Sequence, residues 1–230
     1  MTHALARAVR QALHAHADPV RAPQMQRYMK SAMPYYGVSA PVQKGLWREV
    51  FAAHPIASCD DLHAAALDLW RHARYREERY AAIALTDRRQ HGSCQTVEAV
   101  PVYEEMIVTG AWWDYVDPLA SHHLGAVLRQ APARMAPLLR RWARSEESLW
   151  KRRAAILCQL QFKGETDLDL LYGCIEPNLA DRNFFVRKAI GWALRQYAWT
   201  DASEVQRYVA AHRDRLSPLS VREALKNVGE

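Results

Sequence analysis

The chain has 230 residues, of which half are hydrophobic, and a formal net charge of +6. This length fits one large domain, or an elongated repeat array, better than two independent domains. No run of 18 consecutive apolar residues occurs, which excludes a transmembrane helix, and the N-terminus does not read as a secretory leader, so we expect a cytoplasmic protein. The basic excess favours an anionic partner, usually nucleic acid or a membrane surface.

The cysteine and histidine residues have spacings that argue against a metal site. The four cysteines are far apart and form no CxxC pair: Cys59, Cys94, Cys158 and Cys174. We therefore expect buried free thiols rather than a disulfide scaffold or a zinc cluster. The pairs His14/His16 and His122/His123 lack the i,i+4 spacing that places two ligands on one helical face. No metal site is expected.

Short amphipathic helices are predicted along the whole chain. The first covers the Ala-rich N-terminal segment, and residues 57–73 follow with a capping residue and a stripe of apolar side chains from Leu62 to Leu69. Residues 74–89 predict a solvated helix with i,i+4 ion pairs, and similar patterns occur in 134–145 and 166–180. Ten or so helices are expected, with breaks at Pro34–Gly37, His54–Pro55, His91–Ser93, Gly110, Lys163–Gly164 and Ser217–Pro218.

A period of 35 residues relates several of these helices. The segment RRAAIL begins at Arg152, RKAIGW begins at Arg187 and REALKN begins at Arg222. RYAAIA at Arg79 lies close to two periods before Arg152, and Asp117 lies one period before it. Such a period is typical of stacked helical hairpins in which each unit buries a face against its neighbours. The second helices would then line one surface together.

That surface is expected to be basic. Cations occupy equivalent positions in the second helices: Arg79, Arg88, Arg89, Arg152, Arg153, Arg187, Lys188, Arg195, Arg222 and Lys226. A basic stripe suits a duplex backbone, although the same residues could form solvated faces paired with Asp and Glu. Asp117 is the acid at a position where other repeats carry Arg or Lys. It requires either an ion pair with a neighbour such as Arg153 or a cation to attract.

The segment GAWWDYVDPLA, residues 110–120, surrounds this acid with aromatic side chains. Trp112 is expected to be the buried member of the tryptophan pair. Pro118 is comfortable only in about the first turn of a helix, so the helix should start near Asp114 or kink here. Packing roles are expected for the tryptophans elsewhere: Trp47, Trp70, Trp142, Trp150 and Trp199.

Five segments together resemble the HEAT-like-repeat alkylpurine DNA glycosylases, the AlkD family of bacterial DNA alkylation repair enzymes. They are WWDYVD at 112–117, LWKRRAAILCQLQF at 149–162, FFVRKAIGWALRQYA at 184–198, YMKSAMPYYGVSAP at 28–41 and PLSVREALKNVG near the C-terminus. The resemblance implies one all-α domain over residues 1–230, a right-handed superhelical solenoid of HEAT-like hairpins with a concave basic groove for duplex DNA. It implies hydrolysis of the N-glycosidic bond of cationic N3- or N7-alkylated purines, without metal or cofactor.

Carried over by motif, the catalytic set that the resemblance implies is Asp117, Trp113, Trp192 and Arg153. Arg153 would hold the phosphate beside the lesion. DNA contacts are expected from Arg152, Arg187, Lys188, Arg195, Lys44 and Tyr28, although Tyr28 could be a core residue. Lys44 stands where the family's pattern has an arginine, and a lysine holds a phosphate without two-pronged geometry.

These residue types suit the expected chemistry. An alkylated cationic purine leaves readily, so the enzyme has to stabilise positive charge on the sugar and place a water. A carboxylate can do both, and tryptophan faces attract a cation. The alternatives are a non-catalytic DNA-binding repeat protein and a helical scaffold for protein partners. We expect a monomer that acts on duplex DNA at the bacterial nucleoid and does not bind a membrane.

Overall fold

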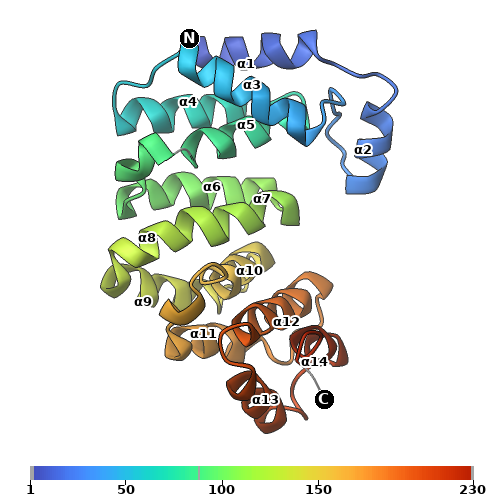
Figure 1. The fold of residues 1–230 in the computed structure, drawn as a ribbon, viewed down its shortest axis with the longest axis vertical. Coiled ribbons are helices and arrows are strands. Elements are labelled where there is room, and N and C mark those ends of the chain that lie inside the picture. Colours follow the sequence, from blue (N-terminus) through green and yellow to red (C-terminus); the bar gives the residue numbers. More distant parts are fainter. Residues whose placement is uncertain (1–2, 88, 229–230) are drawn as a thin grey trace. The chain divides into compact units, whose positions relative to one another are not determined.

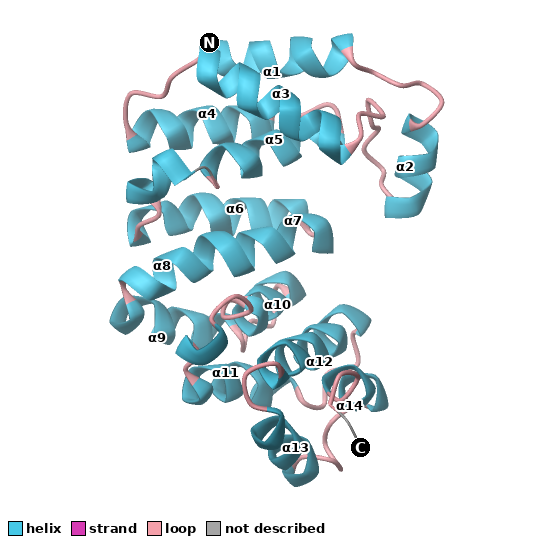
Figure 2. Ribbon diagram, viewed as in Figure 1, coloured by secondary structure: helices cyan, strands magenta, loops and turns pink. Residues whose placement is uncertain are grey.

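The computed structural model describes residues 3–87 and 89–228, and within them the secondary structure is helical without strands (Figure 2). Arg88, one position of the expected basic stripe, lies outside the described residues. The chain divides into two compact units, Met1–Cys94 and Gln95–Glu230. No helix in the described residues is long and apolar enough to cross a bilayer.

The first unit contains five α-helices, of which α1, α3, α4 and α5 pack together, and a short 3-10 segment, η1 (Arg89–Cys94), follows them. α1 contacts α3, α4 and α5, and α4 packs along α5 (Figure 1). The expected apolar stripe of α4 is confirmed, since Leu62, Ala65, Ala66 and Leu69 are buried. The helices are α1 (Ala4–Ala15), α2 (Ala22–Met29), α3 (Ala40–Ala53), α4 (Cys59–Arg71) and α5 (Arg76–Thr86).

The expectation of a solvated helix at residues 74–89 was wrong. In α5, Glu77 and Glu78 are buried, because each carboxylate accepts hydrogen bonds from other elements of the first unit. Glu77 accepts hydrogen bonds from the backbone N–H groups of Tyr36, Gly37 and Val38 at 2.9–3.2 Å. Burial raises the pKa of Glu77, and these backbone hydrogen bonds oppose that rise. The helix therefore anchors the loop before α3 instead of facing water.

The second unit is built from consecutive helical hairpins. The second helix of each hairpin packs against the next: α7 contacts α10, α10 contacts α12, and α12 contacts α14. One 3-10 segment, η2 (Val97–Ala99), precedes the first of its α-helices, and two others, η4 (Lys163–Glu165) and η5 (Glu176–Asn178), lie between later ones. The α-helices are α6 (Val100–Gly110), α7 (Trp113–Pro118), α8 (Gly125–Gln130), α9 (Pro132–Trp142), α10 (Leu149–Leu157), α11 (Leu168–Ile175), α12 (Phe184–Ala198), α13 (Ala202–Ala211) and α14 (Pro218–Ala224).

Residues about one period apart meet across neighbouring hairpins, which confirms the helical-repeat class. Arg129 bonds Glu165 and Arg134 bonds Glu98, each across 36 positions, and Asn178 bonds the Ala143 carbonyl across 35. The helix starts are encoded locally, because polar residues accept a hydrogen bond from the first-turn backbone. Such caps are Ser58, Ser148, Asp167, Asn183, Asp201 and Ser217.

The cysteine prediction was half wrong. Cys59 and Cys94 form a disulfide across 35 residues, with their Cα atoms 5.3 Å apart. Cys59 is the first residue of α4 and Cys94 is the last residue of η1, so the bond ties the end of the first unit to the start of α4. Cys158 and Cys174 are buried free thiols, as expected.

Candidate functional site

The segment that carries Asp117 is one continuous helix made of three parts. α7 begins at Trp113, one residue before the expected start, and Trp112 is its N-cap. A π-helical segment, η3 (Leu119–Leu124), follows Pro118 and leads into α8 (Figure 1). Proline lacks the amide hydrogen that an α-helix needs here, and a π segment is one way to absorb that loss. The expected disturbance at Pro118 is therefore present.

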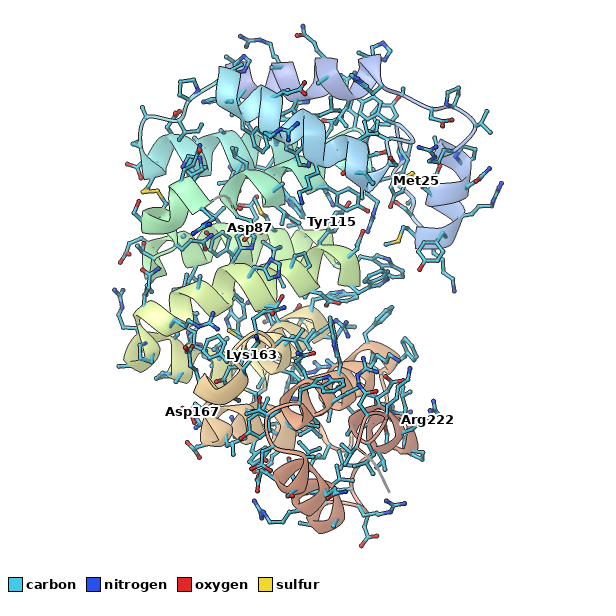
Figure 3. All side chains as sticks on the ribbon, in the orientation of Figure 1. Met25, Asp87, Tyr115, Lys163, Asp167 and Arg222 are labelled. Atoms are coloured by element: carbon cyan, nitrogen blue, oxygen red, sulfur yellow. A yellow bond between two sulfur atoms is a disulfide. The ribbon has the colours of Figure 1, made fainter. Side chains whose placement is uncertain are left out.

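Side chains bond the carbonyl groups around this junction. The Ser121 hydroxyl donates to the Asp117 carbonyl at 2.8 Å, and a ring nitrogen of His123 lies 3.3 Å from the Pro118 carbonyl. His123 is fully buried, with its ring against that of Tyr103 at a centroid distance of 4.9 Å. These contacts hold the backbone of Asp117 in place. Tyr115, labelled in Figure 3, marks the turn of α7 that carries the acid.

Asp117 forms a two-pronged ion pair with Arg153 of α10. The Arg153 Nε lies 2.7 Å from Asp117 Oδ1, and Nη2 lies 2.8 Å from Oδ2. The third guanidinium nitrogen, Nη1, donates to the Phe185 carbonyl at 2.5 Å. The Arg153 side chain is 4% exposed and that of Asp117 is 12% exposed. The pair that the sequence offered as one of two explanations is thus formed, and Asp117 keeps a small opening to solvent.

Burial dominates the electrostatics of this carboxyl. Desolvation raises the pKa of Asp117 above its ordinary value, while the hydrogen bonds and charge of Arg153 oppose the rise. Asp114, three residues earlier, adds to the rise. The site therefore holds a carboxylate whose charge is less stabilised than in water and can gain from a second cation.

An aromatic cluster lies beside the ion pair. The Phe185 ring lies 5.3 Å from that of Trp112 and 5.0 Å from that of Trp150, measured between centroids. Phe184, next to Phe185, is 57% exposed. Trp150 is buried, as expected, whereas Trp112 is only partly so. Sequence analysis did not single out Phe185, although FFVRK follows LWKRR by one repeat.

The other two aromatic candidates are accessible. Trp113, in the first turn of α7, and Trp192, in the middle of α12, are each partly exposed. Of the tryptophans assigned to packing, Trp47, Trp70 and Trp142 are indeed buried, but Trp199 is 71% exposed. That assignment was wrong for Trp199, because the residue follows the last turn of α12, where no neighbouring helix covers it.

The expected DNA-binding cations of the second unit are engaged with acids or backbone. Arg152 binds Asp181 at 3.0 Å, and the Arg187 Nε donates to the Asp181 carbonyl at 2.7 Å. Both Lys188 and Arg195 pair with Glu223, at 2.6 and 2.9 Å. The Lys188 ammonium, followed by Arg195, keeps the pKa of Glu223 below its ordinary value. The paired alternative for the stripe is thus realised at three of these positions, Arg187 bonds a backbone carbonyl instead, and each of the four side chains remains partly exposed.

Two further candidates belong to the first unit. Tyr28, near the end of α2, is 79% exposed and so is not a core residue. Lys44 lies on the exposed side of α3 and lines a cavity of about 520 Å³ with Trp47, Arg48 and Phe51. Within the described residues, no three His, Cys, Asp or Glu side chains gather as metal ligands.

Comparison with known proteins identifies the family. The sequence profile described as DNA alkylation repair enzyme matches residues 9–228. The chain belongs to the DNA alkylation repair enzyme family. Its fold is similar to the solved structure of a predicted DNA alkylation repair enzyme from Enterococcus faecalis, with a TM-score of 0.82 and 28% identity over 94% of this chain and 98% of the other. No curated protein matches the sequence significantly.

The geometry places the four motif residues on neighbouring helices of the second unit. In this member of the DNA alkylation repair enzyme family, Asp117 and Arg153 are in direct contact, and Trp113 lies on the same short helix as Asp117. Trp192 lies on α12, which packs against the α10 helix of Arg153. The four motif residues therefore belong to three helices in contact.

Proposed function

We propose that this protein is a DNA glycosylase that hydrolyses the N-glycosidic bond of N3- or N7-alkylated purines in duplex DNA, releasing the free base and leaving an abasic site. The observation that carries the proposal is the Asp117–Arg153 pair, a largely buried carboxylate with a small opening to solvent. Membership of the DNA alkylation repair enzyme family supports the same assignment.

The carboxylate suits a reaction in which positive charge moves onto a sugar. An alkylpurine cation leaves as a neutral base, so no general acid is required at the base. As the bond breaks, Asp117 stabilises the developing oxocarbenium charge and can accept a proton from the attacking water. Both carboxylate oxygens already accept from Arg153, yet each retains a further lone pair for such contacts.

Arg153 acts in this scheme as a positioning residue. All three guanidinium nitrogens have partners, and only 4% of the side chain is exposed. A phosphate would have to compete with Asp117 and the Phe185 carbonyl for these donors. We therefore assign Arg153 the task of fixing the direction of Asp117, and we assign cation contacts to Trp113 and Trp192.

Substrate binding would use the partly exposed cations. Arg152, Arg187, Lys188 and Arg195 can exchange an intramolecular acid for a phosphate, while Lys44 and Tyr28 contribute from the first unit. When one of these cations leaves an acid of the protein for a phosphate, the acid becomes unpaired and binds a cation from solution, which offsets the counterion released from the DNA. The salt dependence of binding should therefore be weaker than a count of basic residues suggests. A protein-binding scaffold would show almost no salt dependence of duplex binding.

The decisive experiment compares base release by the wild type and Asp117→Asn on duplex DNA that contains N7-methylguanine. Single-turnover release should fall tenfold to a thousandfold, which corresponds to ~1.4–4 kcal/mol. The matched control is Glu204→Gln, because Glu204 forms an equivalent two-pronged pair with Arg207 in the same unit. It should leave release unchanged.

The same variants separate chemistry from binding and folding. Affinity of Asp117→Asn for undamaged duplex should stay equal or increase, because a negative charge has been removed. Weaker duplex binding with undiminished release would remove Asp117 from the catalytic set. Wild-type protein that binds duplex but releases no base would favour a non-catalytic DNA-binding protein.

A further inference from the structure

A second basic cavity lies in the first unit, at the C-terminal end of α1. Its volume is about 590 Å³, within the range of small-molecule sites. Two of its basic side chains, Arg10 and His14, come from α1, and two more, His72 and Arg74, come from the connection between α4 and α5. All the lining residues belong to the first unit, whereas Asp117 belongs to the second.

The acid in this cavity is already neutralised. Glu78 is 1% exposed, and its Oε2 accepts from the Arg10 Nε at 2.8 Å. Its other oxygen, Oε1, accepts from the Tyr36 hydroxyl at 3.3 Å. The Arg10 Nη2 also donates to the Asp68 carbonyl at 3.3 Å. Arg10 and Glu78 thus form a fixed floor, and the carboxylate does not repel an anion as an isolated charge would.

Donors remain available around this floor. Within the described residues, neither the Arg74 guanidinium nor the His14 ring has a hydrogen-bond or ion-pair partner, and both side chains are exposed. His72 contacts Asp68 through Nδ1 at 2.9 Å, and its Nε2 can donate to an anion when the ring carries both protons. A phosphate group is the ligand that a free guanidinium with two adjacent imidazoles recognises best.

The remaining wall is aromatic. The rings of Tyr36 and Tyr75 stack with centroids 3.8 Å apart and an interplanar angle of 23°. Tyr36 is held at both ends, because its backbone N–H donates to the buried Glu77 and its hydroxyl donates to Glu78. A cavity of this volume that joins phosphate donors to a fixed aromatic wall fits a nucleotide better than inorganic phosphate alone.

We propose that this cavity binds a nucleotide, with Arg74, His14 and His72 holding the phosphate and the tyrosines contacting the sugar or base. The nucleotide can be free or part of a nucleic-acid strand, since the phosphate chemistry is the same. This site is independent of base release at Asp117.

Isothermal titration calorimetry with AMP, adenosine and inorganic phosphate tests the site. AMP should bind more tightly than either fragment, and Arg74→Gln should weaken AMP binding about tenfold, the contribution expected of a charge-assisted contact. Arg48→Gln is the matched control, because Arg48 is an exposed arginine of the same unit that lines a different cavity. It should leave AMP affinity unchanged.

Two outcomes would overturn the proposal: equal affinity for AMP in the two arginine variants, or adenosine binding as tightly as AMP. A short single-stranded oligonucleotide without terminal phosphates identifies the source. If it binds more tightly than AMP and is weakened by Arg74→Gln but not by Arg48→Gln, the ligand is a strand. Asp117→Asn should bind AMP normally, so failure of the glycosylase proposal would leave this one standing.

Discussion

Asp117 shows how a single residue can be both a structural partner and a reactive group. Its pairing with Arg153 costs desolvation of two charges, and the raised pKa of the carboxyl reports that this cost is not fully recovered. An acid whose pKa rises on folding stabilises the protein below its unfolded pKa and loses that contribution as the pH rises through the folded pKa. The ionised Asp117 can therefore attract a cation, but its burial lowers the stability of the folded protein.

A pH profile follows from this shift. The ionised carboxylate is the active form, so base release should decline as the pH falls through the raised pKa of Asp117. The acidic limb should therefore lie above the ordinary aspartate value of 3.8. Single-turnover rates, corrected for spontaneous base loss without enzyme, provide the measurement. If Asp117→Asn retained the same limb in its residual activity, the titrating group would be another residue.

Trp192 provides a second residue-scale prediction. Because its side chain is partly exposed, Trp192→Ala should lower the free energy of unfolding by less than about 2 kcal/mol, while base release falls at least tenfold. The buried Trp142 serves as the control, and Trp142→Ala should cost about 3–5 kcal/mol of stability. Denaturant unfolding and base release, measured on both variants, decide the matter. A collapse of stability in Trp192→Ala would instead assign Trp192 to the core.

The sequence could name the residues at this scale but not their contacts. The resemblance to the family's motifs led to Asp117, Arg153, Trp113 and Trp192, and the sequence left open whether Arg153 faces a phosphate or Asp117. That choice depends on burial and side-chain rotamer, which spacing along a helix does not determine. The Phe185 carbonyl, which takes the third nitrogen of Arg153, belongs to another hairpin and gives no signal in the sequence around either partner.

At the scale of elements, α12 and α14 pack closely together at a glycine of α12, Gly191. A Cβ added at Gly191 would lie 2.5 Å from the Glu223 Cβ and 2.8 Å from the Ser220 carbonyl oxygen. Gly191→Ala should therefore destabilise the second unit by about 1–3 kcal/mol, even though alanine favours a helix. The control is Gly45→Ala in α3, where no atom lies within 4 Å of the added Cβ and a gain of about 0.5–1 kcal/mol is expected. Denaturant unfolding would contradict the close packing if both changes were stabilising.

Local signals in the sequence predicted where the helices begin and end better than they predicted which helix side chains are buried. Breaks and caps such as Ser58 and Ser217 are local, and they recur in the structure. The burial of Glu77 and Glu78 in α5 depends on Arg10 and on the loop at Tyr36, both distant in sequence. An i,i+4 pattern contains no information about such partners, so the helix was expected to face solvent.

At the scale of the whole molecule, the disulfide bears on the stability of the first unit. Reduction should lower its free energy of unfolding by ~2–4 kcal/mol, because a loop of 35 residues is no longer closed in the unfolded chain. Unfolding with and without a thiol reductant measures this, and Cys59→Ser should abolish the difference. The oxidised, denatured protein should react with a thiol reagent at Cys158 and Cys174 alone. Four reactive thiols would contradict the bond.

The repeat positions in the sequence placed cations on the second helices but did not show which groups they bond. Asp181 and Glu223 pair with Arg152, Lys188 and Arg195, and these acids lie 28–35 residues from their partners. The period of 35 residues gave the helical-repeat class because stacking repeats one pattern of burial. Individual acids that neutralise the cations are placed by the packing of neighbouring hairpins, which composition cannot describe.

The π segment between Leu119 and Leu124 fits an additional residue into the long helix in which it lies. Each residue of an α-helix advances the side-chain direction by ~100°, and a π turn accommodates an additional residue per turn. A π turn thus completes about the same rotation with one residue more, so deleting one residue from this segment would let a regular helix continue with Asp117 facing nearly the same direction relative to α8. The extra residue instead places side chains of this segment against the junction itself, where the Ser121 hydroxyl donates to the Asp117 carbonyl and a His123 ring nitrogen lies near the Pro118 carbonyl.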